Sequence, residues 1–502
     1  MNALILGDNL FQTGRLGILR TPGAHRVATH LRDYGIPTEV VDFFLSWTTD
    51  ELTQLLKSLV NDNTLFVGIS CSLMVDGVDL YEHIKNYLRT NHPKVAIIIG
   101  GYATYNKYSG ADYYLEGYSE TAVIALVEHL KDPNKELKYE LDDRGNKVIY
   151  TKRLYPINNL TPLQIVYQPS DFIQSSEALS LETGRGCIFK CKFCDFQLLG
   201  KKKVDHLRDP DDVRAEIINN YNNYGITKYI LVEDTFNDTE EKVDMLYEIT
   251  QSLPFKLQLM GYLRLDLLAA KPHTIKKLID SGFTSMHFGI ETMNDTAGKI
   301  VGKGMPAERT KAMLTQIKKD YPDVYINATF IVGLPGEPPE SVKETAQWLI
   351  DSRTVDFWTF NPLMIPKKSK FLYSSEFSNN YMLYGYSKMP DEEVEKFKLE
   401  GSLGLFGVKA LPFMVVWKNQ YFNYFDAAKL TYEVNQAANT YKKIDAWTTF
   451  AISGLGIDLK EVQTHSYTGK NPIDQTLINQ KSMDFINQYK KNKLNYLTKN
   501  SV

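Results

Sequence analysis

Three of the four cysteines of this 502-residue chain lie within eight residues of one another. They are Cys187, Cys191 and Cys194, spaced C-x3-C-x2-C within residues 184–194. Thiolates are soft ligands that favour zinc or an iron–sulfur cluster. The spacing therefore indicates a metal-binding loop to which the protein supplies three ligands.

The missing fourth ligand distinguishes the two kinds of metal site. A structural zinc site needs four protein ligands, usually as two pairs. Cys71 is distant in sequence and ends a predicted core strand, where a buried and inert thiol is expected. His206 is the nearest histidine, but it stands alone. A [4Fe–4S] cluster on three cysteines leaves one iron open for a substrate or cofactor. We expect this catalytic arrangement, with a zinc or purely structural site as the alternative.

Composition places the chain among ordinary globular proteins. Hydrophobic residues make up 43% and charged residues 23%, and the formal net charge is −3. This charge gives no electrostatic reason to expect a nucleic-acid or membrane partner, and no nucleic-acid module is evident. Neither a signal peptide nor an apolar run of about 20 residues is visible. We expect a cytoplasmic protein of about three domains.

Residues 1–130 alternate short apolar strand patterns with amphipathic helix patterns. This alternation predicts a parallel sheet with helices on both faces, a flavodoxin-like (Rossmann-like) doubly wound domain. Such sheets bind ligands at the carboxyl ends of their strands. Small residues, which allow a ligand to approach the backbone closely, gather at these predicted strand ends. The alternative is that the glycines among them only form turns. The candidates for ligand contact are Ser70, Ser72, Gly100, Gly101 and Gly117.

The pattern weakens over residues 131–177, which we interpret as a linker with a possible hairpin near 143–146. It weakens again after residue 370. Residues 371–502 then show helical patterns at 391–400, 425–443 and 473–495. We expect a mainly helical C-terminal domain that closes over the preceding one and helps to select the substrate.

The cysteine loop belongs to a third pattern, a run of strand–helix units over residues 178–370. Successive βα units imply a parallel sheet curled into a full or partial barrel, with its chemistry at the C-terminal mouth of the strands. The cysteine loop directly follows the first strand and therefore lies at that mouth. The six predicted strands are 178–182, 228–233, 256–262, 284–290, 325–332 and 355–364.

A C-x3-C-x-aromatic-C loop after the first strand of a βα barrel resembles the radical S-adenosylmethionine (SAM) superfamily. Cys187, Cys191, Phe193 and Cys194 match the motif, and the resemblance extends over about residues 178–365. It implies a partial (β/α)6 barrel with a [4Fe–4S] cluster whose open iron chelates SAM. One-electron reduction would then cleave SAM to methionine and a 5′-deoxyadenosyl radical, which abstracts a hydrogen atom.

The same resemblance assigns roles to residues at the ends of the later strands. Without a role in SAM binding, Asp234 would be a helix cap and Arg264 would form a surface salt bridge. A carboxylate such as Glu291 is rarely placed at a barrel mouth for packing. No catalytic residue is assigned. The residues that the resemblance places against SAM are Phe193, Glu233, Asp234, Arg264, Gly289, Glu291, Asn327 and Val332.

The N-terminal domain resembles that of the cobalamin-binding subgroup of this superfamily. The matching segments are residues 23–35, 95–101 and 111–117. The D-x-H-x-x-G signature, which supplies a histidine to cobalt, is absent, because Asn-Leu-Phe-Gln follows Asp8. The resemblance implies cobalamin as a possible third cofactor, at the carboxyl ends of the N-terminal strands.

These features favour a cobalamin-dependent radical SAM methyltransferase that acts on an unactivated carbon. One alternative is a cobalamin-independent rearrangement or cyclisation enzyme, and another is a non-catalytic iron–sulfur binding or sensing protein. A methylthiotransferase is less favoured, because no further cysteines could hold the second cluster that such enzymes use. The expected partners are a small-molecule or peptide substrate and an electron donor such as flavodoxin or ferredoxin.

Overall fold

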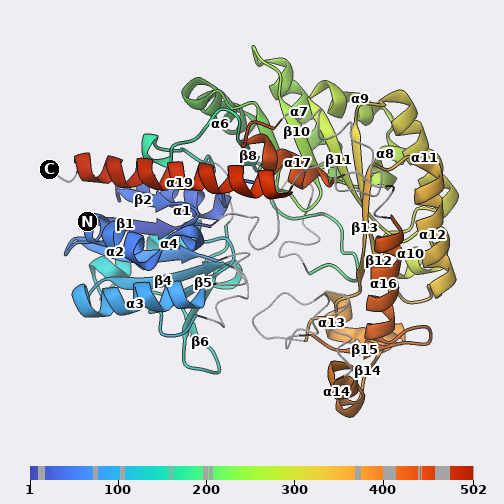
Figure 1. Cartoon of the computed structure of the whole chain (residues 1–502), viewed down its shortest axis with the longest axis horizontal. Helices are drawn as coiled ribbons and strands as arrows, with labels where there is room; N and C mark the ends of the chain where they lie inside the picture. Colours follow the sequence, from blue (N-terminus) through green and yellow to red (C-terminus); the bar gives the residue numbers. More distant parts are fainter. Residues whose placement is uncertain are drawn as a thin grey trace.

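A computed structural model gives the arrangement of most of the chain (Figure 1). Ser72 and His206, both singled out above, lie outside the described residues. The described residues are 1–8, 17–71, 77–101, 108–157, 160, 162–195, 202, 207–367, 375–399, 414–438, 441, 444–457 and 475–500.

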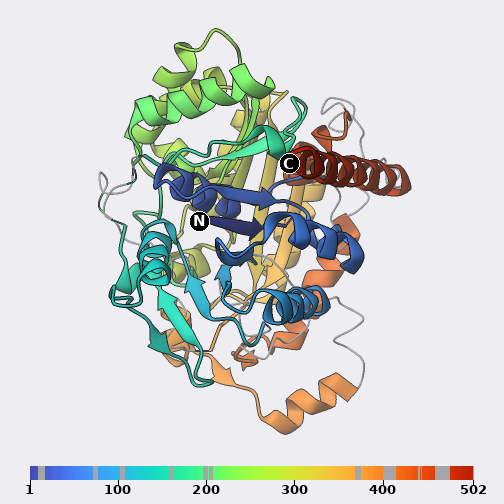
Figure 2. The same cartoon turned by 90° about the vertical axis from the view of Figure 1, so that its left-hand side faces the viewer.

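The first unit is a mostly parallel sheet with helices on both faces (Figures 1 and 2). Its strand order is β2-β1-β3-β4-β5-β7-β6. Helices α1 and α4 contact each other, and so do α2 and α3, and a separate apolar core lies on each face of the sheet. The predicted doubly wound class is confirmed. The elements are β1 (Asn2–Leu6), α1 (Pro22–Asp33), β2 (Thr38–Val41), η1 (Phe44–Ser46), α2 (Thr49–Leu59), β3 (Thr64–Ser70), α3 (Val78–Asn91), β4 (Ala96–Gly101), β5 (Tyr113–Glu116) and α4 (Glu120–Lys131).

A hairpin after α4 extends this sheet by two strands. Strand β6 (Glu140–Leu141) is antiparallel to β7 (Lys147–Tyr150), which pairs in parallel with β5. The Asp142 side chain forms the turn, because its carboxylate accepts from the backbone N–H groups of Arg144 and Asn146 at 2.9 and 2.8 Å. Part of the segment predicted as a linker therefore belongs to the first sheet. The segment continues through α5 (Thr151–Leu154) and η3 (Pro169–Asp171).

The second unit is a six-stranded parallel sheet in sequential order, β8 to β13. Each strand lies at or within three residues of its predicted bounds, and helices follow the strands on the outside (Figure 1). This sheet is the predicted partial barrel. The elements are β8 (Ala178–Leu181), α6 (Pro210–Tyr224), β9 (Lys228–Leu231), η4 (Phe236–Asp238), α7 (Glu240–Gln251), β10 (Gln258–Leu263), α8 (Leu265–Ala270), α9 (His273–Asp280), β11 (Phe283–Glu291), α10 (Asp295–Val301), α11 (Ala307–Asp320), β12 (Tyr325–Val332), α12 (Pro339–Ser352) and β13 (Phe357–Pro362).

The two faces of this sheet have different partners. Outward residues such as Met286 and Ile326 join the large core shared with the surrounding helices. Inward residues such as Met260 and Tyr325 form a smaller apolar cluster with Phe450 of α17 (Ala446–Ser453). Helix α17 also contacts β8, so it supports the inner face of the sheet (Figure 1).

The C-terminal segment is mainly helical, as predicted, but its helices do not form one layer over the barrel. Helix α16 packs on β13 and α12. Helix α19 instead lies along the first unit (Figure 1), where Phe485, Ile486 and Tyr489 join the first unit's core. The elements before and after α17 are α13 (Glu376–Asn380), η5 (Tyr381–Tyr384), β14 (Ser387–Lys388), α14 (Asp391–Leu399), β15 (Trp417–Lys418), α16 (Tyr424–Ala438) and α19 (Gln475–Asn500).

Among the described residues, no helix combines the length and the apolar character that crossing a bilayer requires.

Candidate active site at the barrel mouth

The cysteine loop follows β8 and is fastened to neighbouring loops through its backbone. Lys192 N donates to Val301 O at 3.0 Å, and Lys192 O accepts from Phe377 N at 3.0 Å. Ile188 N donates to the Asp238 carboxylate at 3.2 Å. Inside the loop, Cys194 N donates to Cys191 O at 3.1 Å, which closes a turn between the second and third cysteines. The loop is therefore held at the mouth from three sides.

All three cysteines are free thiols. Cys187 is buried and the other two are half-buried, and burial raises the pKa of the Cys187 thiol. In the described residues, no three His, Cys, Asp or Glu side chains are already arranged around one point as metal ligands. The chemistry of the donor set nevertheless fits an iron–sulfur cluster, because it consists of three thiols on one anchored loop.

Glu233 follows β9 and is engaged with the start of the cysteine loop. Its Oε1 accepts from Thr183 Oγ1 at 2.6 Å and from the backbone N–H groups of Thr183 and Gly184. Its second carboxylate oxygen is buried and has no partner. Burial raises the pKa of Glu233. This residue, predicted to face SAM, thus positions the loop with one oxygen and keeps the other unpaired.

Asp234, the next residue, is half-buried. Burial, opposed by Lys242 and reinforced by the nearby carboxylates of Glu233 and Glu182, raises the pKa of Asp234 to about 7. A carboxyl group with this pKa exchanges a proton near neutral pH. Asp234 therefore has the properties of a group that can hold or release a proton at the mouth.

Arg264 follows β10 and lies directly beside the cysteine loop. Its Nη1 donates to Cys191 Sγ at 3.4 Å, and its guanidinium carbon lies 3.9 Å from the centre of the Phe189 ring. Asp266 holds the opposite side of the guanidinium at 2.6 Å. Arg264 is 4% exposed, so the surface salt bridge considered above is not its environment. A cation here stabilises negative charge on the Cys191 sulfur.

The end of β11 is irregular where Gly289 and Glu291 lie. Glu291 has φ 70°, a left-handed conformation that is unusual for a residue with a side chain. Its carboxylate pairs with Lys303 at 2.8 Å, and a Cβ built on Gly289 would lie 2.5 Å from that carboxylate. A side chain at position 289 would therefore displace the ends of this ion pair. Lys303 also lies 6.0 Å from the ring of Phe193.

The two predicted residues of β12 differ in their environment. Asn327 is fully buried, and neither its amide oxygen nor its amide nitrogen has a hydrogen-bond partner. Val332 ends the strand and is also fully buried, within the outer core. Its backbone carbonyl accepts from Leu363 N at 2.9 Å. Asn327 thus faces the inside of the barrel, whereas the Val332 side chain packs outside it.

At the other unit, the predicted ligand-binding residues lie together at the carboxyl edge of the first sheet. Ser70 and Gly100 pair in register at the ends of β3 and β4, with Gly101 next to them. Gly117 follows β5 with φ 102°. Among the described residues, a Cβ built on Gly100 would meet no atom closer than Ile69 O, at 3.9 Å. In this part of the structure, the edge therefore leaves space above Gly100.

A buried polar atom points to the same edge. Thr21, the residue before α1, is 5% exposed, and its hydroxyl has no hydrogen-bond partner among the residues that the structure describes. The hydroxyl would lie 3.2 Å from a Cβ built on Gly7, just after β1. An unpaired buried hydroxyl beside this glycine fits a ligand that covers the edge.

Arg185 of the cysteine loop joins the carboxyl edge of the first sheet to the mouth of the barrel. Its guanidinium pairs with Glu120 at 2.5 Å and with Glu182 at 2.8 Å, and it lies 3.9 Å from the centre of the Tyr118 ring. A second bridge runs from Arg26 of α1 to Glu182 at 2.9 Å. The carboxyl edge of the first sheet therefore contacts the loop that holds the cysteines.

Sequence reasoning missed this junction and a second feature inside the barrel. Arg185 carried no signal beyond its place beside the cysteines, and Glu120 lay in a predicted strand-end loop with nothing to indicate its partner. His287 on β11 is 7% exposed, and both of its ring nitrogens lack a partner. A signal did exist for His287, since Ser285 and His287 are polar residues at alternate positions of a buried strand.

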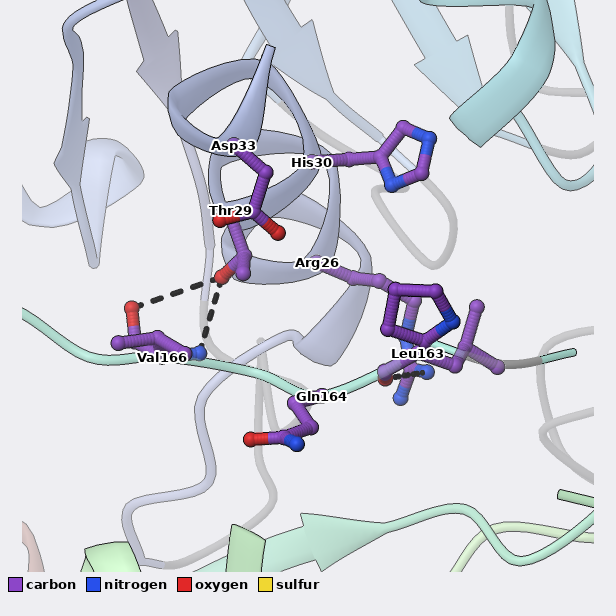
Figure 3. A pocket seen from close by; sticks show the side chains of 8 residues that line it. Arg26, Thr29, His30, Asp33, Leu163, Gln164 and Val166 are labelled. Carbon is purple, nitrogen blue, oxygen red and sulfur yellow. Dashed lines mark hydrogen bonds between the residues drawn. The ribbon is translucent and has the colours of Figure 1, made fainter. Parts of the chain in front are cut away.

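A cavity of about 230 Å³ lies elsewhere, between α1 and residues 162–166 (Figure 3). Two of its polar side chains are already engaged, because Arg26 donates to Leu163 O at 2.6 Å and Thr29 accepts from Val166 N at 2.9 Å. None of the residues predicted to bind a cofactor lines this cavity.

Glu337, close to the end of β12, gives the stability of the protein a testable pH dependence. Burial raises the pKa of Glu337 to about 8, although a hydrogen bond from Thr292 at 2.6 Å opposes the shift. Its pKa is higher in the folded state than in the unfolded state, so stability decreases as pH rises towards 8. We expect this residue to lower the free energy of unfolding by about 2 kcal/mol between pH 6 and pH 8.

Glu337→Gln should remove that part of the pH dependence, because an amide does not titrate. Urea denaturation of both proteins at pH 6, 7 and 8 measures the difference. Equal slopes of stability against pH for the two proteins would show that Glu337 is ionised in the folded state at neutral pH.

Comparison with known proteins bears on the barrel and on the whole arrangement. Residues 181–349 match the family model described as the radical SAM superfamily. Among curated proteins, the tRNA-2-methylthio-N(6)-dimethylallyladenosine synthase of Natranaerobius thermophilus is 22% identical over 290 residues, which cover 55% of this chain and 60% of the relative. The chain thus spans about three fifths of the length of that relative.

Two solved structures share the arrangement of both units. One is the radical S-adenosylmethionine methyltransferase TsrM from Kitasatospora setae, solved with tryptophan and a SAM analogue, at 15% identity, 75% coverage of each chain and a TM-score of 0.59. The other is the cobalamin-dependent S-adenosylmethionine radical enzyme OxsB, solved with aqua-cobalamin and SAM, at 13% identity and a TM-score of 0.53. It covers 99% of this chain and 80% of its own. At these identities the likeness shows a common fold.

Proposed function

The chain belongs to the radical SAM superfamily through its central domain, and we propose that it is a cobalamin-dependent methyltransferase that acts on an unactivated carbon. Membership implies a [4Fe–4S] cluster and SAM as cofactors. Cys187, Cys191 and Cys194 would hold the cluster. Arg264, in contact with the Cys191 sulfur, and the unpaired oxygen of Glu233 lie close to where SAM would bind.

The observation that carries the cobalamin part of the proposal is the contact between the two carboxyl edges. Glu120 and Tyr118 lie just after Gly117 on the first sheet, and both contact Arg185, two residues before Cys187. A ligand on the first edge would therefore face the cysteine loop. The space above Gly100 and the unpaired Thr21 hydroxyl support a ligand at this edge. Cobalamin would supply a methyl carrier there.

The proposed reaction has a fixed stoichiometry. One SAM gives up its methyl group and leaves as S-adenosylhomocysteine. A second SAM accepts one electron and is cleaved to methionine, and its adenosyl carbon removes a hydrogen atom from the substrate to leave as 5′-deoxyadenosine. The substrate radical would take the methyl group from the carrier, and a second electron would return the carrier to the state that accepts a methyl group. Each methyl transfer thus consumes two SAM molecules and two electrons, which an electron donor such as flavodoxin or ferredoxin would supply.

Anaerobic reconstitution with cluster and cobalamin tests the proposal before the substrate is known. After gel filtration, the protein should retain one cobalamin, detected by its visible spectrum, and should produce 5′-deoxyadenosine from SAM when reduced. Gly100→Leu adds bulk at the edge where a side chain meets no close atom. This variant should lose cobalamin but keep its iron and its melting temperature.

Each other outcome identifies a different function. Production of 5′-deoxyadenosine by a protein that never retains cobalamin would favour a cobalamin-independent rearrangement or cyclisation. Absence of SAM cleavage by protein with a full cluster would favour a non-catalytic iron–sulfur protein. The substrate is expected to be a small molecule or a peptide.

A further inference from the structure

Three neutral side chains inside the barrel form a polar layer. They are Ser285 and His287 on β11 and Asn327 on β12. Their neighbours Met286, Phe288, Ile326 and Ala328 belong to the outer core. Because side chains alternate along a strand, the three polar residues face inward. The His287 ring lies 4.5 Å from that of Tyr262, which lies 5.8 Å from Trp447 of α17. His287 and Asn327 therefore lie above the apolar base formed with α17. Ser285 lies one step lower, in register with Met260 and Tyr325 of that base.

The polar layer is buried and unpaired. Ser285 and Asn327 are fully buried and His287 is 7% exposed. Within the described part of the chain, no hydrogen-bond partner exists for the Ser285 hydroxyl, both ring nitrogens of His287 and both amide atoms of Asn327. His287 and Asn327 are direct neighbours in the strand register, yet they do not bond to each other. Since the large majority of buried polar side-chain atoms are bonded to protein, water or ligand, this layer fits a partner that is not part of the chain.

The chemistry of the layer restricts that partner. Burial lowers the pKa of His287 to about 4, so its imidazole is neutral at neutral pH and offers one donor and one acceptor. The Asn327 amide offers both as well. Lys303 is the cation that adds to the lowering of the pKa of His287, and it is already paired with Glu291 at 2.8 Å. A charged group in this layer would lack a counter-charge, and its burial would be strongly unfavourable.

We propose that the polar layer binds an uncharged group of the substrate that presents a hydrogen-bond acceptor next to a donor, such as a carboxamide or a lactam edge of a heterocycle. The group enters from the mouth, and Asn327, which the resemblance placed against SAM, would contact the substrate instead. The inference rests on the proposed function in that the bound molecule is the substrate of the radical chemistry.

Stability of the ligand-free protein gives the first test. Asn327→Leu removes two unpaired polar atoms from the interior and should raise the melting temperature by about 1–3 °C. Asn237→Leu is the matched control. Asn237 is also buried, at 5% exposure, but it accepts from Arg264 N at 2.7 Å and donates to Arg264 O at 3.0 Å. The control should lower the melting temperature. A similar loss in both variants would overturn the inference, because Asn327 would then have partners within the fold.

A charge series of one small scaffold gives the second test. Benzamide, benzoate and benzamidinium share a ring and differ in the charge of the attached group. Saturation-transfer NMR with the cluster-loaded protein should detect benzamide alone, and His287→Leu and Asn327→Leu should each weaken its binding about 5–100-fold. Equal binding of an ionic probe, unchanged binding by the variants, or no binding of benzamide would each contradict the inference.

These measurements are independent of methyl transfer. A protein that binds benzamide through the polar layer but never retains cobalamin would contradict the proposed function and leave this inference standing. A protein that retains cobalamin and cleaves SAM but fails both tests would contradict this inference alone.

Discussion

Serine in place of Cys191 will abolish reductive cleavage of SAM and leave the fold intact. The Cys191 sulfur is half-buried and contacts the guanidinium of Arg264 at 3.4 Å, and its loop is held by backbone bonds that do not involve the side chain. A serine hydroxyl fits the same space but is a hard and poorly ionised ligand. Because loss of an outer partner of a metal ligand already costs about 10–100-fold, loss of the ligand should cost at least about 1,000-fold.

Iron and sulfide content after anaerobic reconstitution, together with 5′-deoxyadenosine produced from SAM, measure this effect. Cys71→Ser is the matched control. Cys71 is 1% exposed in the first unit, where its sulfur donates to Gly100 O at 3.3 Å. The control should keep a full iron content. A variant at Cys191 that retains both the cluster and SAM cleavage would rule out the three-cysteine site.

Alanine in place of Arg185 should destabilise the junction between the two units by about 3–5 kcal/mol, because two buried carboxylates lose their common cation. Arg185 is 2% exposed, and Glu120 and Glu182 are also buried. Burial of these carboxylates opposes ionisation, but Arg185 outweighs it and lowers the pKa of both. Their contribution to stability is therefore present near neutral pH and is lost as pH falls below about 4.5.

Urea denaturation of the variant measures the loss at neutral pH. Without Arg185, Glu120 should take up a proton, whereas Glu182 keeps its ion pair with Arg26. Arg185→Ala should therefore become more stable as pH is lowered from 7 towards 5, while the natural chain should change little. Arg153→Ala provides the control, because Arg153 pairs with Glu140 on the exposed hairpin and such a pair is worth about 1 kcal/mol at most. An equal loss in both variants would mean that Arg185 does not organise the junction.

The strands of the barrel could be predicted from local patterns alone. The fifth strand was predicted at 325–332 and forms as Tyr325–Val332, because its apolar run is buried and bounded by turns. The helical character of α19 was also readable, but its position was not. Its contact with the first unit depends on Tyr489 and Lys493, which bond to residues more than 400 positions away. No local pattern encodes such a pairing.

The candidate site divides in the same way. The spacing of the cysteines is a local property, and it led directly to the loop and to its place at the mouth. The bonds of Glu233 to Thr183 and Gly184 could not be read from the sequence, because they join the ends of two different strands. The unpaired state of Asn327 was equally hidden, since only the packed structure shows which polar atoms have no partner.

Helix α19 links the time course of protein synthesis to the folding of the first unit. The Tyr489 hydroxyl accepts from Asp42 N across 447 residues of sequence, and the ammonium of Lys493, fully buried, donates to Val40 O at 2.6 Å. At about 5–20 residues per second, a ribosome needs on the order of 20 to 90 s to make the residues between these partners. Phe43 and Phe172, whose rings meet that of Tyr489 edge-on, lack this cover during that interval. The first domain to be synthesised is therefore among the last to be completed.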